Sequence, residues 1–332
     1  MKKTKFKKVV IWGYPLYSHT HSFVHYAWHK VFKHLGYETY WFDDNNFPGD
    51  FDFNECLFIT EGYADKKIPV VKSSVYFVHV CIDPVKYLSV GSRLVDIRFN
   101  LKKTKDFSYE YTRPDDKLTK LDAFTFYEKN ANDSALVEKY RKGTAGYEAV
   151  YMYWATDFLP NDINFTDAFI ERTSTVYHVG SYWTANMREL QIFEKSLKAK
   201  GLSLEIRDPW KIKTTNEEAV RLVQQSYIAP DIRGSGVTCD EALAEECNHL
   251  TIGYIPCRIF KNISYGQLGI TNSQAVKELM GDFVVHSNSV EELLDSAEPH
   301  RKNYEKIIAS MAYVRDNHTF VNRAQALLTI LN

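Results

Sequence analysis

Long hydrophobic runs are absent from the sequence, which argues against a membrane-spanning segment. The basic start, residues 1–8, is followed by an apolar run of four residues, 9–12. That length suits a β-strand and is too short for the core of a secretory signal or for a transmembrane helix. We therefore expect no transmembrane segment and a cytoplasmic location. Weak peripheral membrane contact through the basic start is the alternative to a solubilising tail.

Paired cysteines and an excess of charge of one sign are also missing. The five cysteines are odd in number and form no CxxC pair, which is typical of reduced, mostly buried thiols. The formal net charge is −1, so no global field attracts nucleic acid, and we expect no nucleic-acid partner. Aromatic residues are abundant, with 22 Tyr, 20 Phe and 6 Trp. Such side chains stack on sugars or nucleobases and also fill ordinary cores, and both interpretations remain open.

The order of apolar segments indicates an α/β protein with two domains. A length of 332 residues favours two hydrophobic cores. Residues 22–35 have the apolar spacing of a helix, with Ser22 as candidate N-cap and Gly36 as its end. The polar, Pro-containing stretch 157–167 is the candidate linker. The strands predicted before it are residues 7–13, 37–44, 56–60, 75–83, 94–99, 120–128 and 147–156, of which 94–99 and 120–128 are candidates for antiparallel pairing.

The alternation of strands and helices begins again after the linker. We expect domains at residues 1–160 and 161–315, followed by a helix within 316–332 that packs on the first domain. The predicted strands of the second half are residues 174–183, 202–210, 251–260 and 283–287, with a strand-and-loop segment at 225–234. Its predicted helices are residues 185–200, 216–225 (capped by Asn216), 239–247, 289–294, 299–315 and 319–331.

A group of histidines follows the first predicted strand. His19 and His21 lie in the loop where α/β domains bind ligands. Because histidine titrates near neutral pH, either residue is a candidate general base toward an attacking hydroxyl. His25 and His29 continue the group at helical spacing, which also suits a zinc ion, but residues 21 and 29 are about 12 Å apart along a helix, so at most two of the three reach one ion. Hydrogen-bonded structural histidines are the third interpretation.

Acidic residues near predicted strand ends are candidates for supporting roles. Asp83 could orient an acceptor hydroxyl or assist a histidine, although an Asp-Pro turn also explains it. Asp44 ends the second predicted strand and could bind a sugar. Asp50 and Asp52 match the DxD pattern that holds a pyrophosphate through a divalent ion, but they precede a strand, so we interpret the match as coincidence.

The second half contains segments typical of an anion site. Gly180 and Ser181 end its first strand, where backbone N–H groups can approach a phosphate and the next helix begins. A Gly-rich loop with Asp231 and Arg233 could face the nucleobase or ribose. It does not fit GxGxxG, so we expect no dinucleotide cofactor. Residues 253–273 combine cations, hydroxyls and glycines with a predicted helix that opens at Thr271, Asn272 and Ser273. This arrangement suits a diphosphate, with an ordinary surface loop as the alternative. Its candidate donor-binding residues are Arg258, Lys261, Ser264, Tyr265, Gly266, Thr271, Asn272 and Ser273.

Residues 8–44 and 253–273 together resemble microbial and viral GT-B glycosyltransferases. The resemblance concerns the layout of most of the chain. It implies two Rossmann-like β/α/β domains facing a central cleft, with C-terminal helices crossing back. In that family the C-terminal domain binds the nucleotide-sugar and the N-terminal domain binds the acceptor, commonly with a His or acidic base in the first loop. The family's E-x7-E pattern is not evident here, which leaves the donor sugar and the stereochemical outcome open.

The resemblance implies roles for individual residues of this sequence. The catalytic candidates are His21, His19 and Asp83, and the acceptor-binding candidates are Tyr17, His25 and Asp44. The expected reaction moves a sugar from a nucleoside-diphosphate sugar to a hydroxyl of a glycan or other acceptor, with inversion and without metal or cofactor. A nucleotide-sugar epimerase or hydrolase of the same fold and a non-catalytic sugar-binding protein are the alternatives.

Overall fold

The computed structural model describes residues 6–98, 119–121, 147–182, 185–236, 248–250 and 253–331. These residues divide into two compact units. Of the described residues, unit 1 contains those up to Arg98, those within Asp116–Met152 and those from Arg323 onward, and unit 2 contains those within Tyr153–Asn322. The helix predicted at 239–247 and most of the strand predicted at 120–128 lie outside the described residues. No helix within the described ranges is both long and apolar enough to cross a membrane.

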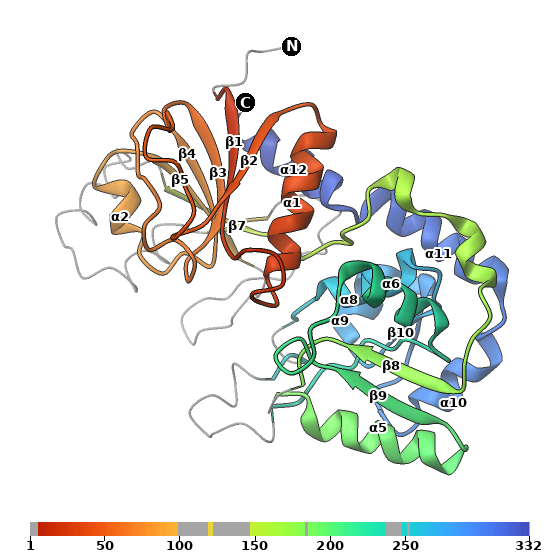
Figure 1. Cartoon of the computed structure of the whole chain (residues 1–332). Coiled ribbons are helices and arrows are strands. Elements are labelled where there is room, and N and C mark those ends of the chain that lie inside the picture. Colours follow the sequence, from red (N-terminus) through yellow and green to blue (C-terminus); the bar gives the residue numbers. More distant parts are fainter. Residues whose placement is uncertain are drawn as a thin grey trace. The chain divides into compact units, whose positions relative to one another are not determined.

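Unit 1 is built on a parallel sheet (Figure 1). Its described strands are ordered β2-β1-β3-β4-β5-β7-β6, and every neighbouring pair is parallel except β6 and β7. The predicted α/β class with a parallel sheet is therefore confirmed, while the antiparallel pairing considered for residues 94–99 is wrong because β5 runs parallel to both neighbours. The strands are β1 (Lys8–Trp12), β2 (Glu38–Phe42), β3 (Cys56–Glu61), β4 (Val75–His79), β5 (Arg93–Arg98), β6 (Thr119–Leu121) and β7 (Tyr147–Tyr151).

Helix α1 (Ser22–His34) contacts β1, β2 and β3. Its apolar face is buried as predicted, through residues such as Trp28 and Val31. The N-cap position is His21, so the prediction of Ser22 as cap is wrong by one residue; the Ser22 hydroxyl instead accepts a hydrogen bond from the Tyr17 backbone. Gly36 follows the helix in a left-handed conformation, with φ of 82°. The four-residue helix α2 (Val85–Leu88) and the end of α12 (Phe320–Ile330) also belong to unit 1.

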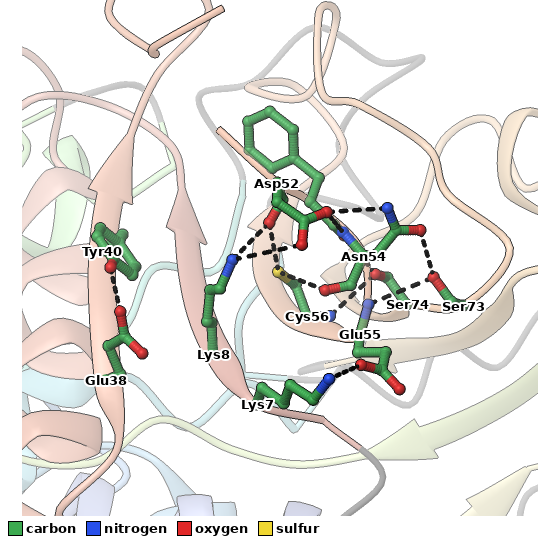
Figure 2. Close-up of polar contacts among 11 residues, drawn as sticks. Lys7, Lys8, Glu38, Tyr40, Asp52, Asn54, Glu55, Cys56, Ser73 and Ser74 are labelled. Carbon is green, nitrogen blue, oxygen red and sulfur yellow. Dashed lines mark hydrogen bonds and ion pairs between the residues drawn. The ribbon is translucent and has the colours of Figure 1, made fainter. Parts of the chain in front are cut away.

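Polar contacts fix the turn that precedes β3, at the amino end of the sheet (Figure 2). Lys8 Nζ donates to the Asp52 carbonyl over 2.8 Å, and the Asp52 carboxylate accepts hydrogen bonds from the backbone and side chain of Asn54. The Ser74 hydroxyl accepts from the Cys56 backbone over 3.0 Å. The Asp52 carboxylate thus stabilises a structural turn, which agrees with the interpretation of the DxD match as coincidence. The turn lies at the opposite end of the sheet from the strand carboxyl ends.

The described residues of unit 2 contain two pairs of parallel strands. Strands β8 (Thr175–Val179) and β9 (Ser203–Arg207) pair with each other, and so do β10 (Gly269–Thr271) and β11 (Val284–His286). A single bridge joins Asp231 to Thr271. Thr215, not Asn216, caps α6, because the Thr215 hydroxyl accepts from the Glu218 backbone. The helices are α5 (Met187–Ala199), α6 (Asn216–Gln225), α8 (Cys257–Ser264), α9 (Gln274–Met280), α10 (Leu293–Ala297) and α11 (Tyr304–Asn317), with short 3-10 turns at Pro160–Asp162, Phe165–Phe169, Gly281–Phe283 and Glu298–His300.

The strand predicted at 251–260 is wrong, because helix α8 occupies Cys257–Ser264. Pro256 lies at its N-cap position, where a missing N–H costs nothing. Ile259, Phe260 and Ile263 recur at helical spacing and are fully buried. The helix predicted to open at Thr271 is also displaced, since that residue ends β10 and α9 begins at Gln274 with Ser273 as its N-cap.

Candidate functional site

The carboxyl ends of β1, β3 and β4 bring an exposed histidine to a buried carboxylate. His21 follows the β1 loop and its side chain is 43% exposed, whereas Glu61 ends β3 and its side chain is 6% exposed. His21 Nδ1 lies 2.8 Å from Glu61 Oε2. Burial alone would raise the pKa of Glu61, but the hydrogen bond from His21 and the nearby histidines outweigh it and lower that pKa. An ionised carboxylate therefore holds the His21 ring by Nδ1, and Nε2 becomes the nitrogen that would exchange a proton with a substrate.

His25 lies behind this pair and has no exposed surface. Its Nδ1 accepts the Tyr14 backbone N–H over 3.1 Å, so the neutral ring carries its proton on Nε2, which lies 3.6 Å from Glu61 Oε2. Gly13 provides the space, since a Cβ there would lie 2.2 Å from His25 Cε1. Burial lowers the pKa of His25 to about 4, so the ring is neutral at pH 7. Its complete burial does not suit the predicted acceptor contact and places His25 as a support for Glu61.

Aromatic residues and strained backbone surround the exposed side of the pair. The His19 ring stacks on Tyr14 with ring centroids 4.0 Å apart, and its Nδ1 accepts the His21 backbone N–H over 3.1 Å. Burial and then the charge of Glu61 raise the pKa of Tyr14 to about 12. Tyr17 and Val80 both have positive φ, at 68° and 52°. Such conformations are costly for residues other than glycine and concentrate at functional sites.

His19, His21 and Glu61 also form the one group of possible metal ligands within the described part of the chain, with ligand atoms within 4.8 Å of one another. Two histidines and a carboxylate suit zinc or iron. The hydrogen bonds favour a different interpretation. His19 Nδ1 accepts an N–H, which leaves its proton on Nε2, and the 2.8 Å between His21 Nδ1 and Glu61 Oε2 is shorter than the roughly 3.3 Å between two ligands of a tetrahedral zinc ion. This geometry is that of a hydrogen-bonded base.

Asp83 and Asp44, the acidic site candidates of unit 1, both have structural partners. The Asp83 carboxylate is exposed and accepts the Lys86 backbone N–H at the start of α2, over 3.2 Å. The Asp44 carboxylate accepts from Trp12 Nε1 and the Lys67 backbone. The carboxylate that contacts His21 is therefore Glu61, which the sequence interpretation missed. The available signal was a charged residue closing the apolar run of residues 56–60 directly before Gly62, at a strand carboxyl end.

Unit 2 brings together predicted donor-binding residues from separate segments. Arg233 NH2 lies 2.6 Å from Asp231 Oδ1, and Arg258 NH1 lies 3.9 Å from the same oxygen. The side chains of Asp231 and Arg233 are nearly inaccessible, and that of Arg258 is 16% exposed. Among the residues that the structure describes, one carboxylate thus faces two guanidinium groups, which leaves an excess positive charge. Nε of both arginines and NH1 of Arg258 have no hydrogen-bond partner, so the cluster retains donors for an anion.

The surroundings of the cluster place Arg258 against Gly180 and fix the backbone of Arg233. A Cβ at Gly180 would lie 2.2 Å from Arg258 NH2, and the φ of 145° at this position favours glycine. The Asn272 side chain accepts from the Arg233 backbone N–H over 2.7 Å and donates to its carbonyl over 2.9 Å. Burial, followed by the charges of Arg258 and Arg233, lowers the pKa of His178 well below its usual value. Burial and the neighbouring Arg233 lower the pKa of Arg258 to about 10, so it remains charged at pH 7.

The other predicted donor-binding residues take part in internal contacts of unit 2. Because α8 replaces the predicted strand, its last turn faces residues 156–168. Lys261 Nζ lies 3.2 Å from Asp157 Oδ2, and the Tyr265 hydroxyl donates to Asp157 Oδ1. The remaining contacts join Ser264 to Thr156, Gly266 to Asp167 and Arg172, Thr271 to Ser273, Ser273 to Val276, and Ser181 to Asn186. These residues fix the fold around the arginine cluster.

A scan against protein-family models and a search of the curated proteins find no match for this chain. Its function is therefore inferred from the His21–Glu61 pair and the Asp231–Arg233–Arg258 cluster.

Acid is expected to destabilise unit 1 before its carboxylates are neutralised. Burial lowers the pKa of His25 to about 4 and that of His79 to about 3. In the unfolded chain both histidines bind a proton near pH 6.5, whereas in the folded chain they stay neutral to lower pH. The free energy of unfolding should therefore fall as the pH drops from about 6.5 to 4. The slope is up to ~1.4 kcal/mol per pH unit for each histidine. Urea unfolding at pH 7, 6 and 5 measures the slope.

The matched variant for this measurement is His79→Gln. Trp28 Nε1 donates to His79 Nε2 over 3.1 Å, and the glutamine amide retains an acceptor for it. The variant should show a shallower dependence on pH than the wild type. Equal unfolding free energies for the wild type at pH 7 and pH 5 would contradict the assignment of neutral buried histidines.

Proposed function

We propose that this chain is a glycosyltransferase that moves a sugar from a nucleoside-diphosphate sugar to an acceptor hydroxyl. The observation that carries the proposal is the His21–Glu61 pair, with Nδ1 and Oε2 2.8 Å apart and His21 exposed. An imidazole held by a buried carboxylate is the usual arrangement for removing a proton from a hydroxyl. The arginine cluster of unit 2 supports the proposal because it suits an anionic donor.

The proposed step balances one bond formed against one bond broken. As the acceptor oxygen attacks the anomeric carbon, its proton passes to Nε2 of His21, and Glu61 stabilises the resulting imidazolium. The bond from the anomeric carbon to the diphosphate breaks at the same time. In unit 2, the charge of Arg233 and Arg258 suits binding of a nucleoside diphosphate, on which negative charge develops when this bond breaks. Attack opposite the leaving group inverts the configuration at the anomeric carbon.

Release of nucleoside diphosphate tests the proposal directly. The protein is incubated with UDP-, GDP- and dTDP-sugars, with and without a mixture of glycan acceptors, and with and without EDTA. We expect one base to be preferred, release to increase with acceptor, and EDTA to have no effect. In parallel, a nucleotide at 100 times its dissociation constant should stabilise the fold by about 2.7 kcal/mol, visible as a raised melting temperature.

The alternatives predict different results in this experiment. Equal release with and without acceptor would indicate a nucleotide-sugar hydrolase. Conversion of the sugar without lasting loss of the nucleotide would indicate an epimerase. If no nucleotide stabilises the fold and no nucleotide-sugar is cleaved, the donor assignment is wrong, and the proposed transfer reaction fails with it.

A further inference from the structure

Two exposed apolar residues lie in the loops that follow β3, which ends at Glu61, and β4. Tyr63 is 68% exposed and Ile82 is 48% exposed, and Tyr63 is the most exposed large hydrophobic residue of the described chain. Tyr63 is two residues beyond Glu61, in a tight turn closed by the Ala64 N–H donating to the Glu61 carbonyl over 3.0 Å. The turn that carries Tyr63 is therefore tied to Glu61.

The loops that carry Tyr63 and Ile82 touch through Gly62. Its N–H donates to the His79 carbonyl over 3.0 Å. A Cβ at Gly62 would lie 2.4 Å from the Val80 carbonyl oxygen and 3.0 Å from Ile82 Cγ1. Glycine at 62 lets the turn after β3 rest against the turn after β4. The close approach brings the two apolar residues onto neighbouring loops at the same sheet edge.

The exposure of Tyr63 and Ile82 needs an explanation because a residue next to each of them is buried. Ala64 is 8% exposed and Cys81 is 5% exposed, although each neighbours an exposed apolar residue. Val80, two residues before Ile82, has the left-handed φ of 52° that is rare for a β-branched residue. An exposed aromatic residue in a turn next to strained backbone, close in sequence to the partner of a candidate base, is typical of a binding surface.

We propose that Tyr63 and Ile82 form a platform for the sugar ring of the acceptor, an inference that rests on the proposed transfer reaction. A pyranose has one face of C–H groups and a rim of hydroxyls. Its apolar face can pack on the tyrosine ring and the isoleucine side chain while a rim hydroxyl meets His21. Two exposed apolar side chains suit one sugar ring, and the residue that follows Ile82 is the exposed Asp83. The acceptor class is therefore a glycan.

Binding of simple glycosides tests the platform without nucleotide or turnover. The probes are methyl glycosides of common hexoses, pentoses and deoxyhexoses, with sorbitol as a polyol that lacks a ring. Saturation-transfer NMR should show binding of at least one glycoside, with the strongest transfer to ring C–H protons and none to sorbitol. Tyr63→Ala should weaken that affinity by about tenfold or more, and Tyr63→Phe should restore it because the ring is kept.

Controls separate this proposal from the proposed function. Trp210→Ala removes a 60% exposed aromatic of unit 2 and should leave glycoside binding unchanged. Tyr63→Ala should keep the wild-type melting temperature because its side chain is exposed. Glycoside binding that depends on Tyr63 supports the platform even if no nucleotide binds, in which case only the transfer reaction fails. No glycoside binding to the wild type, or equal binding by Tyr63→Ala, overturns the platform whatever the nucleotide result.

Discussion

Replacing His21 with glutamine is expected to reduce sugar transfer by about three orders of magnitude while nucleotide affinity stays unchanged. Glutamine can still donate a hydrogen bond to Glu61 but cannot accept the acceptor proton, so the loss reflects general base catalysis, which contributes about 10²- to 10⁴-fold. The measurement compares kcat and the nucleotide dissociation constant of both proteins. The exposed His34, in the last turn of α1, provides the matched control, and His34→Gln should behave as wild type.

Glu61→Gln separates orientation from proton transfer in the same pair. The variant keeps the size of the side chain but removes the charge that stabilises the imidazolium. We expect a drop in kcat smaller than or equal to that of His21→Gln, and the double variant should be no worse than His21→Gln alone because the two residues act as a unit. Retention of more than a tenth of the wild-type rate by His21→Gln would show that another group is the base.

Replacing Arg258 with alanine is expected to weaken binding of the preferred nucleoside diphosphate by about 10- to 100-fold. Charged hydrogen bonds of this kind contribute about 1.5–3 kcal/mol. Without Arg258, Asp231 and Arg233 form a balanced pair with Arg233 NH2 2.6 Å from the carboxylate, and the excess positive charge is lost. Isothermal titration with UDP, GDP and dTDP measures the affinities, and the effect should diminish at high salt.

Two further variants sharpen the interpretation of the Arg258 result. Arg258→Lys retains the charge but not the planar fork, so an intermediate affinity indicates that geometry as well as charge matters. Arg221→Ala removes an exposed arginine from α6 and should bind nucleotide as the wild type does. Wild-type affinity in Arg258→Ala would exclude the cluster as the donor's anion site.

The sequence was sufficient to predict the central strands of unit 1 because β1, β3 and β4 are mostly apolar runs. β3 and β4 are buried at every position, and such runs are typical of parallel strands covered on both faces. The same criterion failed at residues 251–260, where the apolar residues belong to a helix introduced by Pro256. Apolar content alone does not separate a short buried strand from a short buried helix.

The candidate sites were predictable only where neighbours in sequence are also neighbours in space. The His21 loop follows β1 directly, so its place at the sheet edge could be inferred. Its partner Glu61 is 40 residues away, and the contact depends on β1 and β3 being adjacent, which chain order does not dictate. Arg258 lies beside Gly180 and Asp231, with which the sequence interpretation grouped it, whereas Lys261 pairs with Asp157, because helix α8 replaces the predicted strand.

The contact between Gly13 and the His25 ring makes three distant positions interdependent. A Cβ at residue 13 would lie 2.2 Å from Cε1 and 2.4 Å from Nδ1 of His25, so alanine is incompatible with histidine at 25. A sequence that changed residue 13 would have to change residue 25 with it, and the new residue 25 would no longer present an N–H toward Glu61. In related chains, residues 13 and 25 should therefore either both be conserved or both be replaced. A related chain with a side chain at 13 and histidine at 25 must orient its residue 21 in another way.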